Sequence, residues 1–419
     1  MKRKRTTAMA VLGAVAMAAL VTVTWQQSDL GRAAGDLGRQ RAAARREGVP
    51  LEWDDVRRLT PPVADADNAV VDYRIGFADL HAAGNMKGVP TDRLLTALAD
   101  GKAKPEDIEK ARAGLLLAGS ALGEIATGAA KPGFWMNRRW EQGTALLFPE
   151  PSDARSAARA LVLRAMLSQD PKAAAADLIT AAHLSTHFGS EPILISSFVG
   201  ISIESNVHTA LRYLGRRGGA WTQAMVPVAD SFGPLPNLRR TFAGEAAMGN
   251  HLTEELAKYG SNAFSPMEGQ TPIAFRFSGI KPVRDAFQSR VVEYWRKVYA
   301  ALPTDPLDLA ASRAATSIPV PPGSSQALLD MALPALSPSG EMAARADTQR
   351  RLSRVALDLW QGKNPTRPRD PFGKGPLHLR REGKGWTLWS VGEDGIDDGG
   401  KPRVKESDRR YDLVVKSGG

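Results

Sequence analysis

The sequence predicts a mainly α-helical protein that ends in a small antiparallel β module, and three observations predict it. Apolar residues recur three to four positions apart through most of the region between residues 65 and 362. Aromatic residues make up only 6% of the 419 residues, whereas alanine, the best helix former, is abundant. After Asn364 the pattern changes to glycine, proline and tryptophan, with alternation at a period of two.

The composition limits what the protein can be. Hydrophobic residues make up 43% and charged residues 24% of the chain, which is typical of a globular protein. Cysteine is absent, which excludes disulfides, thiol catalysis, cysteine-ligated zinc and iron–sulfur clusters. The formal net charge is +10, a balance that favours anionic partners without choosing among lipid headgroups, nucleic acid and cell-wall polymers.

Residues 1–27 have the pattern of a basic cytoplasmic tip and a transmembrane anchor. Four cations at positions 2–5 precede an apolar stretch over residues 8–25, whose helical length of about 27 Å is close to the ~30 Å hydrocarbon core of a bilayer. Because cations stay on the cytoplasmic side, we expect a single-pass inner-membrane protein with an extracytoplasmic body. The alternative is a cleaved signal peptide, since Ala14-Val15-Ala16 and Ala16-Met17-Ala18 have the small-x-small form of a cleavage site.

Residues 65–302 are expected to form a helical-hairpin array similar to a solenoid. Prolines or acidic residues stand where several helices would begin. The breaks between three of these helices are so short that consecutive helices should be antiparallel neighbours. The expected helices span residues 65–83, with Asp65 or Asp67 as the cap, 91–98, 105–125, 152–167, 171–187, 192–214, 236–259 and 282–302.

The segments on either side of this array have other patterns. Residues 28–64 carry arginines and short alanine runs and then prolines, so we expect a polar helical stalk followed by a loop over residues 52–64. Residues 303–338 hold seven prolines and are expected to form a connector. Residues 339–362 are expected to form a further helix, which Gly362 stops.

Residues 363–419 are expected to form the small β module, with an acidic, glycine-rich loop. Residues 376–380 and 385–391 alternate with Gly383 between them, which predicts a hairpin, and residues 411–415 predict a third strand. In the loop after the second strand, Asp394, Asp397 and Asp398 are candidate ligands for calcium, a hard cation that binds several oxygens. The alternative is a metal-free acidic turn, since Asp-Gly is a common turn pair.

Two resemblances add to this interpretation. Asp370-Pro371-Phe372-Gly373, followed by the segment Ser390–Gly395, resembles the C-terminal β segment of type II secretion major pseudopilins, where a Ser-x-Gly-x-Asp-Gly loop binds calcium. That resemblance implies Asp394, Asp397 and Asp398 as ligands. The whole chain, with Pro61-Pro62-Val63 and Asp67-Asn68-Ala69, resembles a family of uncharacterised membrane-anchored proteins of planctomycete-like bacteria. This second resemblance implies an architecture and no activity.

Two residue pairs have the spacing of zinc ligands on one helix. His183 and His187 are four residues apart on one expected helix, and Glu204 and His208 on the next. If the intervening turn lies near Gly189, His187 and His208 differ by ~25 Å along the helix axes, too far for one ion. We therefore expect structural histidines. The aromatic and basic segment 132–151 is likewise expected to be a packed loop rather than a nucleic-acid site.

Motifs of known hydrolases are nearly absent from the sequence. It holds no Gly-x-Ser-x-Gly, no His-Glu-x-x-His and no phosphate-binding loop, and Pro282 follows the one Ser-x-x-Lys, at 278–281. We expect a non-enzymatic envelope protein that acts in binding or assembly, with the membrane and an envelope protein as partners and no nucleic acid. The alternative is an extracytoplasmic hydrolase that acts on cell-envelope material.

Overall fold

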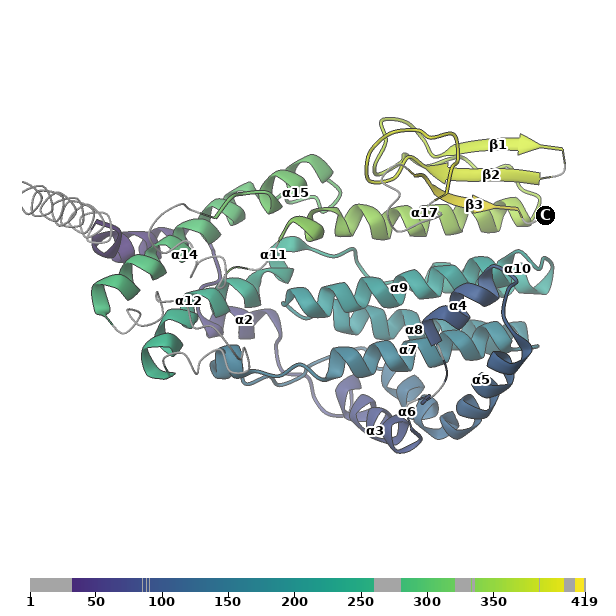
Figure 1. Cartoon of the computed structure of the whole chain (residues 1–419), viewed down its shortest axis with the longest axis horizontal. Coiled ribbons are helices and arrows are strands. Elements are labelled where there is room, and N and C mark those ends of the chain that lie inside the picture. The colour runs from purple at the N-terminus through teal and green to yellow at the C-terminus, as the bar shows by residue number, and fades with distance from the viewer. Residues whose placement is uncertain are drawn as a thin grey trace, which may run out of the picture.

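The computed structural model describes residues 32–84, 91–259, 280–320, 336–383, 385–402 and 411–417, together with residues 86, 87, 89 and 333. This part of the chain is mainly helical and carries a three-stranded antiparallel sheet near its C-terminal end, as the sequence predicts (Figure 1). The expected anchor over residues 1–27 lies outside the described residues. Among the described helices, none combines the length and the apolar character that crossing a bilayer requires.

Four helices form the central layer: α7 (Glu150–Leu167), α8 (Pro171–Gly189), α9 (Leu194–Gly215) and α10 (Ala220–Ala229). Asp170 caps α8 by accepting a hydrogen bond from the Lys172 amide at 2.9 Å, with Pro171 in the first turn, as the sequence predicts. Helix α10 is not among the expected helices. Gly218 and Gly219, both at positive φ, reverse the chain after α9 and return α10 against α8 and α9.

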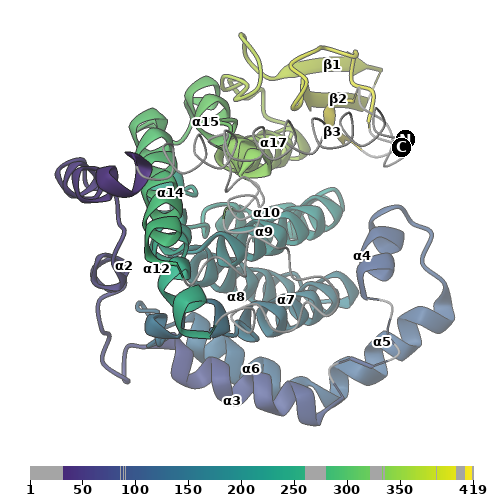
Figure 2. The same ribbon diagram turned by 60° about the vertical axis from the view of Figure 1, so that its left-hand side comes forward.

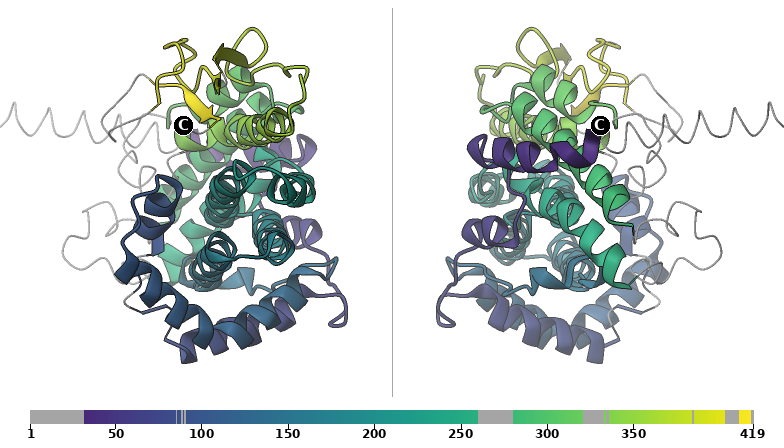
Figure 3. Two further views of the ribbon diagram at one scale, coloured as in Figure 1. Left: turned by 90° about the vertical axis from the view of Figure 1, so that its right-hand side faces the viewer. Right: turned by 90° about the vertical axis from the view of Figure 1, so that its left-hand side faces the viewer.

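A curved outer layer covers one side of the central helices. It comprises α3 (Ala69–Ala82), α4 (Thr91–Ala99), α5 (Pro105–Leu117) and α6 (Gly119–Ala129), which follow an arc around α7–α10 in Figures 2 and 3. The single helix expected over residues 105–125 is divided at Ala118. The prediction of Asp65 or Asp67 as the cap of α3 is wrong, because the Asn68 side chain accepts from the Val70 amide at 3.2 Å.

A second group of helices packs across one end of the central layer (Figure 1). It contains a helix over residues 32–46, α2 (Trp53–Leu59), α11 (Leu238–Thr241), α12 (Ala243–Tyr259), α14 (Lys281–Ala301) and α15 (Leu309–Thr316). The prediction of a loop over residues 52–64 is wrong for residues 53–59, because Glu52 and Asp55 form a capping box that starts α2, whereas residues 60–64 are non-helical as predicted. Buried Ala44 and the hydrogen bond from Arg296 Nε to Glu47, at 2.7 Å, fix the 32–46 helix to this group.

Helix α17 (Met342–Trp360) joins the helical layers to the β module. The sheet has the order β1 (His378–Glu382), β2 (Gly385–Ser390), β3 (Leu413–Lys416), and Leu388 is opposite both Leu379 and Val415. The predicted hairpin, with Gly383 in its turn at φ +56°, is therefore confirmed. Leu352, Val355 and Leu359 of α17 form one apolar core with this sheet, while Leu357 belongs to the core of the central helices. Helix α17 is thus shared by both parts.

Candidate functional site

His183 and His187, the first predicted pair, make internal hydrogen bonds. The Tyr73 hydroxyl lies 2.7 Å from His187 Nδ1, and the Phe134 ring stacks on the imidazole at 5.4 Å. His183 Nδ1 lies 3.0 Å from the Ala129 carbonyl oxygen, to which it donates. Burial lowers the pKa of His187 to about 4, so its imidazole is neutral at physiological pH. These contacts match the structural role expected for the two residues.

Glu204 and His208, the second pair, belong to a polar row on α9 that faces α17. Ser353 Oγ lies 2.9 Å from His208 Nδ1, and Glu204 accepts two hydrogen bonds from Arg350. Burial opposes the charged form of Glu204, but the bonds from Arg350 and His208 lower its pKa. Serine, histidine and glutamate in a row are the components of a hydrolase triad, yet the side chains of His208 and Ser353 are 0% exposed. A substrate cannot reach them in this conformation, and the row attaches α17 to α9.

The three aspartates of the predicted calcium loop make separate hydrogen bonds. Asp394 accepts from the Ile396 amide at 3.0 Å, and Asp397 accepts from Trp389 Nε1 at 2.9 Å, a bond that lowers the pKa of Asp397. The Asp398 amide donates to Asp412 at 3.3 Å. Across the described residues, no cluster of three or more histidine and carboxylate side chains has an arrangement suited to a metal ion. Calcium at this loop stays a prediction.

Two other aspartates, which the sequence analysis did not identify as site residues, hold this loop in place through hydrogen bonds. Buried Asp370 accepts from Ser390 Oγ at 2.7 Å and from the Val391 amide at 2.9 Å. Asp412, also buried, accepts from the amides of Gly400 and Lys401 at 2.7 and 3.1 Å. The residues that carry the pseudopilin resemblance therefore include a carboxylate that holds the start of the module against the end of β2. In the sequence, the Asp370-Pro371 pair was the one feature that pointed to Asp370.

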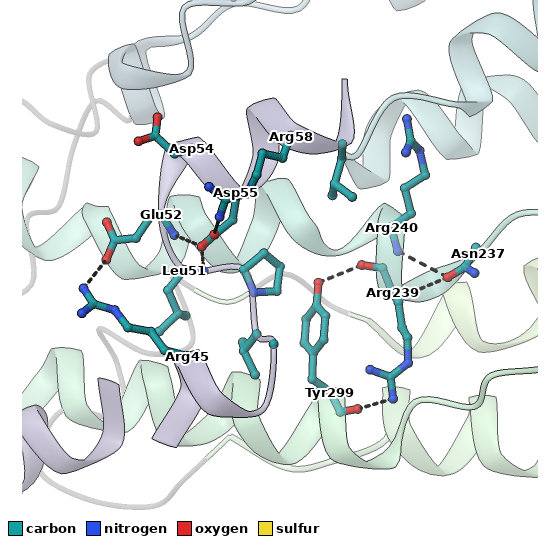
Figure 4. Close-up of a pocket in the computed structure, with 14 residues that line it drawn as sticks. Arg45, Leu51, Glu52, Asp54, Asp55, Arg58, Asn237, Arg239, Arg240 and Tyr299 are labelled. Atoms are coloured by element: carbon teal, nitrogen blue, oxygen red, sulfur yellow. Dashed lines mark hydrogen bonds and ion pairs between the residues drawn. The ribbon is translucent and has the colours of Figure 1, made fainter. Parts of the chain in front are cut away.

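Two cavities lie at α11 and form what we call the α11 site. The larger cavity, of about 820 Å³, lies between α2, α11 and the end of α14 (Figure 4). The smaller cavity, of about 480 Å³, lies between α8, α9 and the loop before α11. Asn237 and Arg240 line both cavities, so the two meet at this one turn of helix. Clefts of this size are where proteins usually hold small ligands.

The sequence around α11 places two consecutive arginines between the cavities. Pro234 and Pro236 prevent helix formation before Asn237, whose side chain then accepts from the amides of Arg239 and Arg240 at 2.9 and 3.4 Å. Figure 4 shows the two arginine side chains extending in opposite directions from this turn. The cap and the prolines are visible in the sequence, but the cavities on either side depend on segments distant in sequence.

Each of the two arginines donates to the carboxyl end of a helix. Arg239 Nη2 donates to the carbonyl oxygens of Tyr299 and Leu302, both at 2.9 Å, at the end of α14. Arg240 Nε donates to the Ser190 carbonyl oxygen at 2.7 Å, at the end of α8. Cations at helix carboxyl ends are stabilised by the helix dipole. These bonds hold both guanidinium groups in fixed positions.

Arg240 retains unused hydrogen-bonding capacity. In the part of the chain that the structure describes, neither Arg239 nor Arg240 has a carboxylate partner, and the Nη groups of Arg240 donate to no protein atom. Arg240 is half-buried, and this burial lowers its pKa. The side chain of Arg138, which is 5% exposed, has the carboxylate partners that a buried cation usually has: it pairs with Glu191 at 2.6 Å and with Glu150 at 3.3 Å.

The acidic groups of the larger cavity are already engaged. Asp55 accepts from the amides of Leu51 and Glu52 at 3.1 and 3.0 Å and pairs with Arg58, while Glu52 lies 4.0 Å from Arg45. The carboxylates near the site therefore form hydrogen bonds and ion pairs at α2 and beside it, and they do not pair with Arg240. Arg240 is thus a fixed cation that no carboxylate of the described residues neutralises, and it lines both cavities, which suits an anionic group.

Comparisons of the chain with protein-family models, with curated proteins and with solved structures give no match in any of the three. The resemblances drawn from the sequence therefore rest on the quoted residues alone.

Proposed function

We propose that this chain is a non-enzymatic, membrane-anchored protein of the cell envelope whose extracytoplasmic body binds an anionic ligand at the α11 site. The observation that carries the proposal is Arg240, a half-buried cation on the wall of two cavities with no carboxylate partner in the described residues. A hydrogen bond between a guanidinium and an anionic group is among the stronger polar contacts in proteins. Arg239, beside it, adds to the positive potential.

The membrane part of the proposal is supported by the sequence. The cations at positions 2–5 and the apolar stretch over residues 8–25 favour a single-pass anchor with its amino terminus in the cytoplasm. A ligand site that follows such an anchor would face the cell envelope. An envelope protein that contacts the helical body remains part of this proposal, because a net charge of +10 favours acidic surfaces.

The layered helices support a helical-hairpin array for the body. Helices α7, α8 and α9 pack consecutively, and α3 and α6 form a further layer over α7 and α8 (Figure 3). Arrays of this kind present extended surfaces for partners. The α11 site lies where this array meets α12 and α14, at a junction between two groups of helices, a frequent place for ligand sites.

The ligand is tested by calorimetric titration of the full chain in nanodiscs of zwitterionic lipid, with empty nanodiscs as the blank. Inorganic phosphate and acetate are the probes. We expect at least one of them to bind and Arg240→Gln to weaken that binding at least tenfold, because a charged hydrogen bond contributes about 1.5–3 kcal/mol. Arg112→Gln, which removes an exposed cation from α5, is the matched control and should leave the affinity unchanged. Equal affinities of the wild type and Arg240→Gln would refute the proposal.

The membrane anchor is tested separately. Alkaline carbonate extraction of cell membranes should leave the full chain in the pellet, and protease added outside the inner membrane should digest the body. Release of the full chain into the supernatant, or a mature amino terminus near residue 19, would show that the anchor interpretation is wrong.

A further inference from the structure

The smaller cavity has a different chemical character from the larger one. Its walls contain Ile201, Leu235 and three prolines, and its polar groups are mostly hydroxyls with internal partners. Ser185 donates to the Gly200 carbonyl oxygen at 2.8 Å, and Ser190 donates to the His187 carbonyl oxygen at 2.7 Å. Because these hydroxyls are already bonded, the cavity presents mainly carbon atoms to its contents.

The charged pair in this wall is also compensated. Glu204 and Arg350 both line the smaller cavity, and they bond to each other at 2.7 and 2.9 Å. Their charges therefore give no preference for an ionic ligand on that side. Arg240, which has no carboxylate partner among the described residues, lies at the boundary with the larger, charged cavity. One end of the combined site thus favours an anion and the other an apolar group.

The size of the smaller cavity suits an alkyl chain. Gly189 and Gly200 bring α8 and α9 together at its base, where a Cβ atom on Gly200 would lie 2.9 Å from the Gly189 Cα. Because a methylene group occupies about as much volume as a water molecule, ~30 Å³, the 480 Å³ cavity has the volume of about 16 methylene groups, so that a chain of eight carbons fits inside it. Burying such a chain would be favourable, since each methylene removed from water adds to the affinity.

We infer that the ligand of the α11 site is a single-chain anionic amphiphile, with its anionic head at Arg240 and its alkyl chain in the smaller cavity. This inference rests on the proposed function and specifies its ligand class. A phosphate head and a carboxylate head both satisfy the guanidinium of Arg240. Compared with the proposed function, this inference adds an alkyl chain to the ligand. The experiment must therefore measure the contribution of the chain to the affinity separately from that of the head group.

The test compares each head group with and without its chain, again by titration of the full chain in nanodiscs. Octyl phosphate is compared with inorganic phosphate, and octanoate with acetate, so that the two arms identify the head group. Octyl glucoside, which has the chain without the charge, measures non-specific uptake. We expect the chain to raise affinity at least tenfold in one arm, and Arg240→Gln to remove most of the binding of that amphiphile.

Variants that fill the smaller cavity provide the second arm. Leu235→Trp, in the loop before α11, should abolish the gain from the chain, which is measured as the ratio of the affinities for the octyl compound and for its bare head group in the same variant; circular dichroism shows that the variant is folded. Ile201→Phe should act in the same direction. Leu147→Trp, at an exposed leucine, is the control for adding a tryptophan.

The outcomes separate the two proposals. If bare phosphate or acetate binds through Arg240 and the octyl chain adds nothing, the inference is wrong and the proposed function stands. If the chain adds affinity that Leu235→Trp and Ile201→Phe do not reduce, the chain lies elsewhere and the inference is also wrong. If no anion binds, both proposals fail.

Discussion

Arg350 of α17 donates two hydrogen bonds to the carboxylate of Glu204 on α9, at 2.7 and 2.9 Å. The same guanidinium donates to the Gly233 carbonyl oxygen at 2.7 Å and lies over the Phe232 ring. Helix α17 also forms the apolar core of the β module, so this ion pair couples the module to the helical body. It lies in the wall of the smaller cavity, where it fixes the loop before α11.

We expect Arg350→Ala to destabilise the protein by about 3 kcal/mol, because removal of one member of a buried ion pair leaves the other charge uncompensated. The free energy of unfolding is measured by urea denaturation followed by circular dichroism. Arg354→Ala, four residues further on the same helix, removes an exposed pair with Asp230 and should cost under about 1 kcal/mol. Equal losses in the two variants would contradict a buried, coupled role for Arg350.

His187 should make stability depend on acid. Burial lowers its pKa from 6.5 to about 4, so the unfolded chain binds a proton in this range before the folded chain does. Its contribution is therefore fully present above pH 6.5 and is lost as the pH falls toward 4, by roughly 3 kcal/mol in total. His187→Gln should flatten the pH dependence of urea unfolding between pH 6.5 and 4. The same substitution at exposed His81 is the control, and a flat wild-type profile would show the prediction wrong.

How far the sequence predicts this fold depends on whether a signal is local. The Asp170-Pro171 pair starts α8 as predicted, because cap and first turn are adjacent in sequence. The cap of α3 could not be chosen in this way, since Asp65, Asp67 and Asn68 are all suitable residues. Asn68 is selected because its side-chain oxygen also accepts from the Trp135 amide at 3.0 Å, a contact formed only in the folded chain.

The candidate site could not be predicted from the sequence because it, too, depends on contacts between residues that are distant in the sequence. Arg239 and Arg240 are two among many basic residues, and their difference from Arg138 lies in which carboxylates reach them. Glu191 reaches Arg138 across 53 residues, whereas no carboxylate of the described residues reaches Arg240. The spacing of Glu204 and His208 was visible, but its partner α17 was not, so the sequence alone could exclude a shared zinc site without showing what the pair does.

Glu245 should make the protein less stable as the pH rises above the ordinary glutamate pKa of 4.5. Burial raises its pKa, and its carboxylate accepts a hydrogen bond from the Leu194 amide at 3.1 Å, at the start of α9. Because the folded-state pKa is raised, the stabilisation is present at low pH and is lost as the pH rises through that pKa. Glu245→Gln keeps an acceptor for Leu194 and should stabilise the protein at pH 8 relative to the wild type, as measured by urea unfolding. Glu109→Gln, on the surface of α5, should change nothing.

The acidic loop of the β module gives a prediction that separates a calcium site from a metal-free turn. If Asp394, Asp397 and Asp398 bind calcium, millimolar calcium should raise the melting temperature of the full chain, because a ligand that binds only the folded state stabilises it. Asp394→Ala should abolish that rise and cost little stability in chelator, since the one hydrogen bond that Asp394 accepts within the described residues is a local bond from Ile396.

Asp397→Ala provides the contrast within the same loop. Asp397 accepts from Trp389 Nε1 and from the Gly399 amide, both at 2.9 Å, so its removal should lower the melting temperature even in chelator. A loop that is only an acidic turn predicts a different pattern: wild type and Asp394→Ala would then respond identically to calcium, and Asp397→Ala would be destabilised to the same extent with and without it. Differential scanning calorimetry of the three proteins, each in chelator and in calcium, decides between the two interpretations.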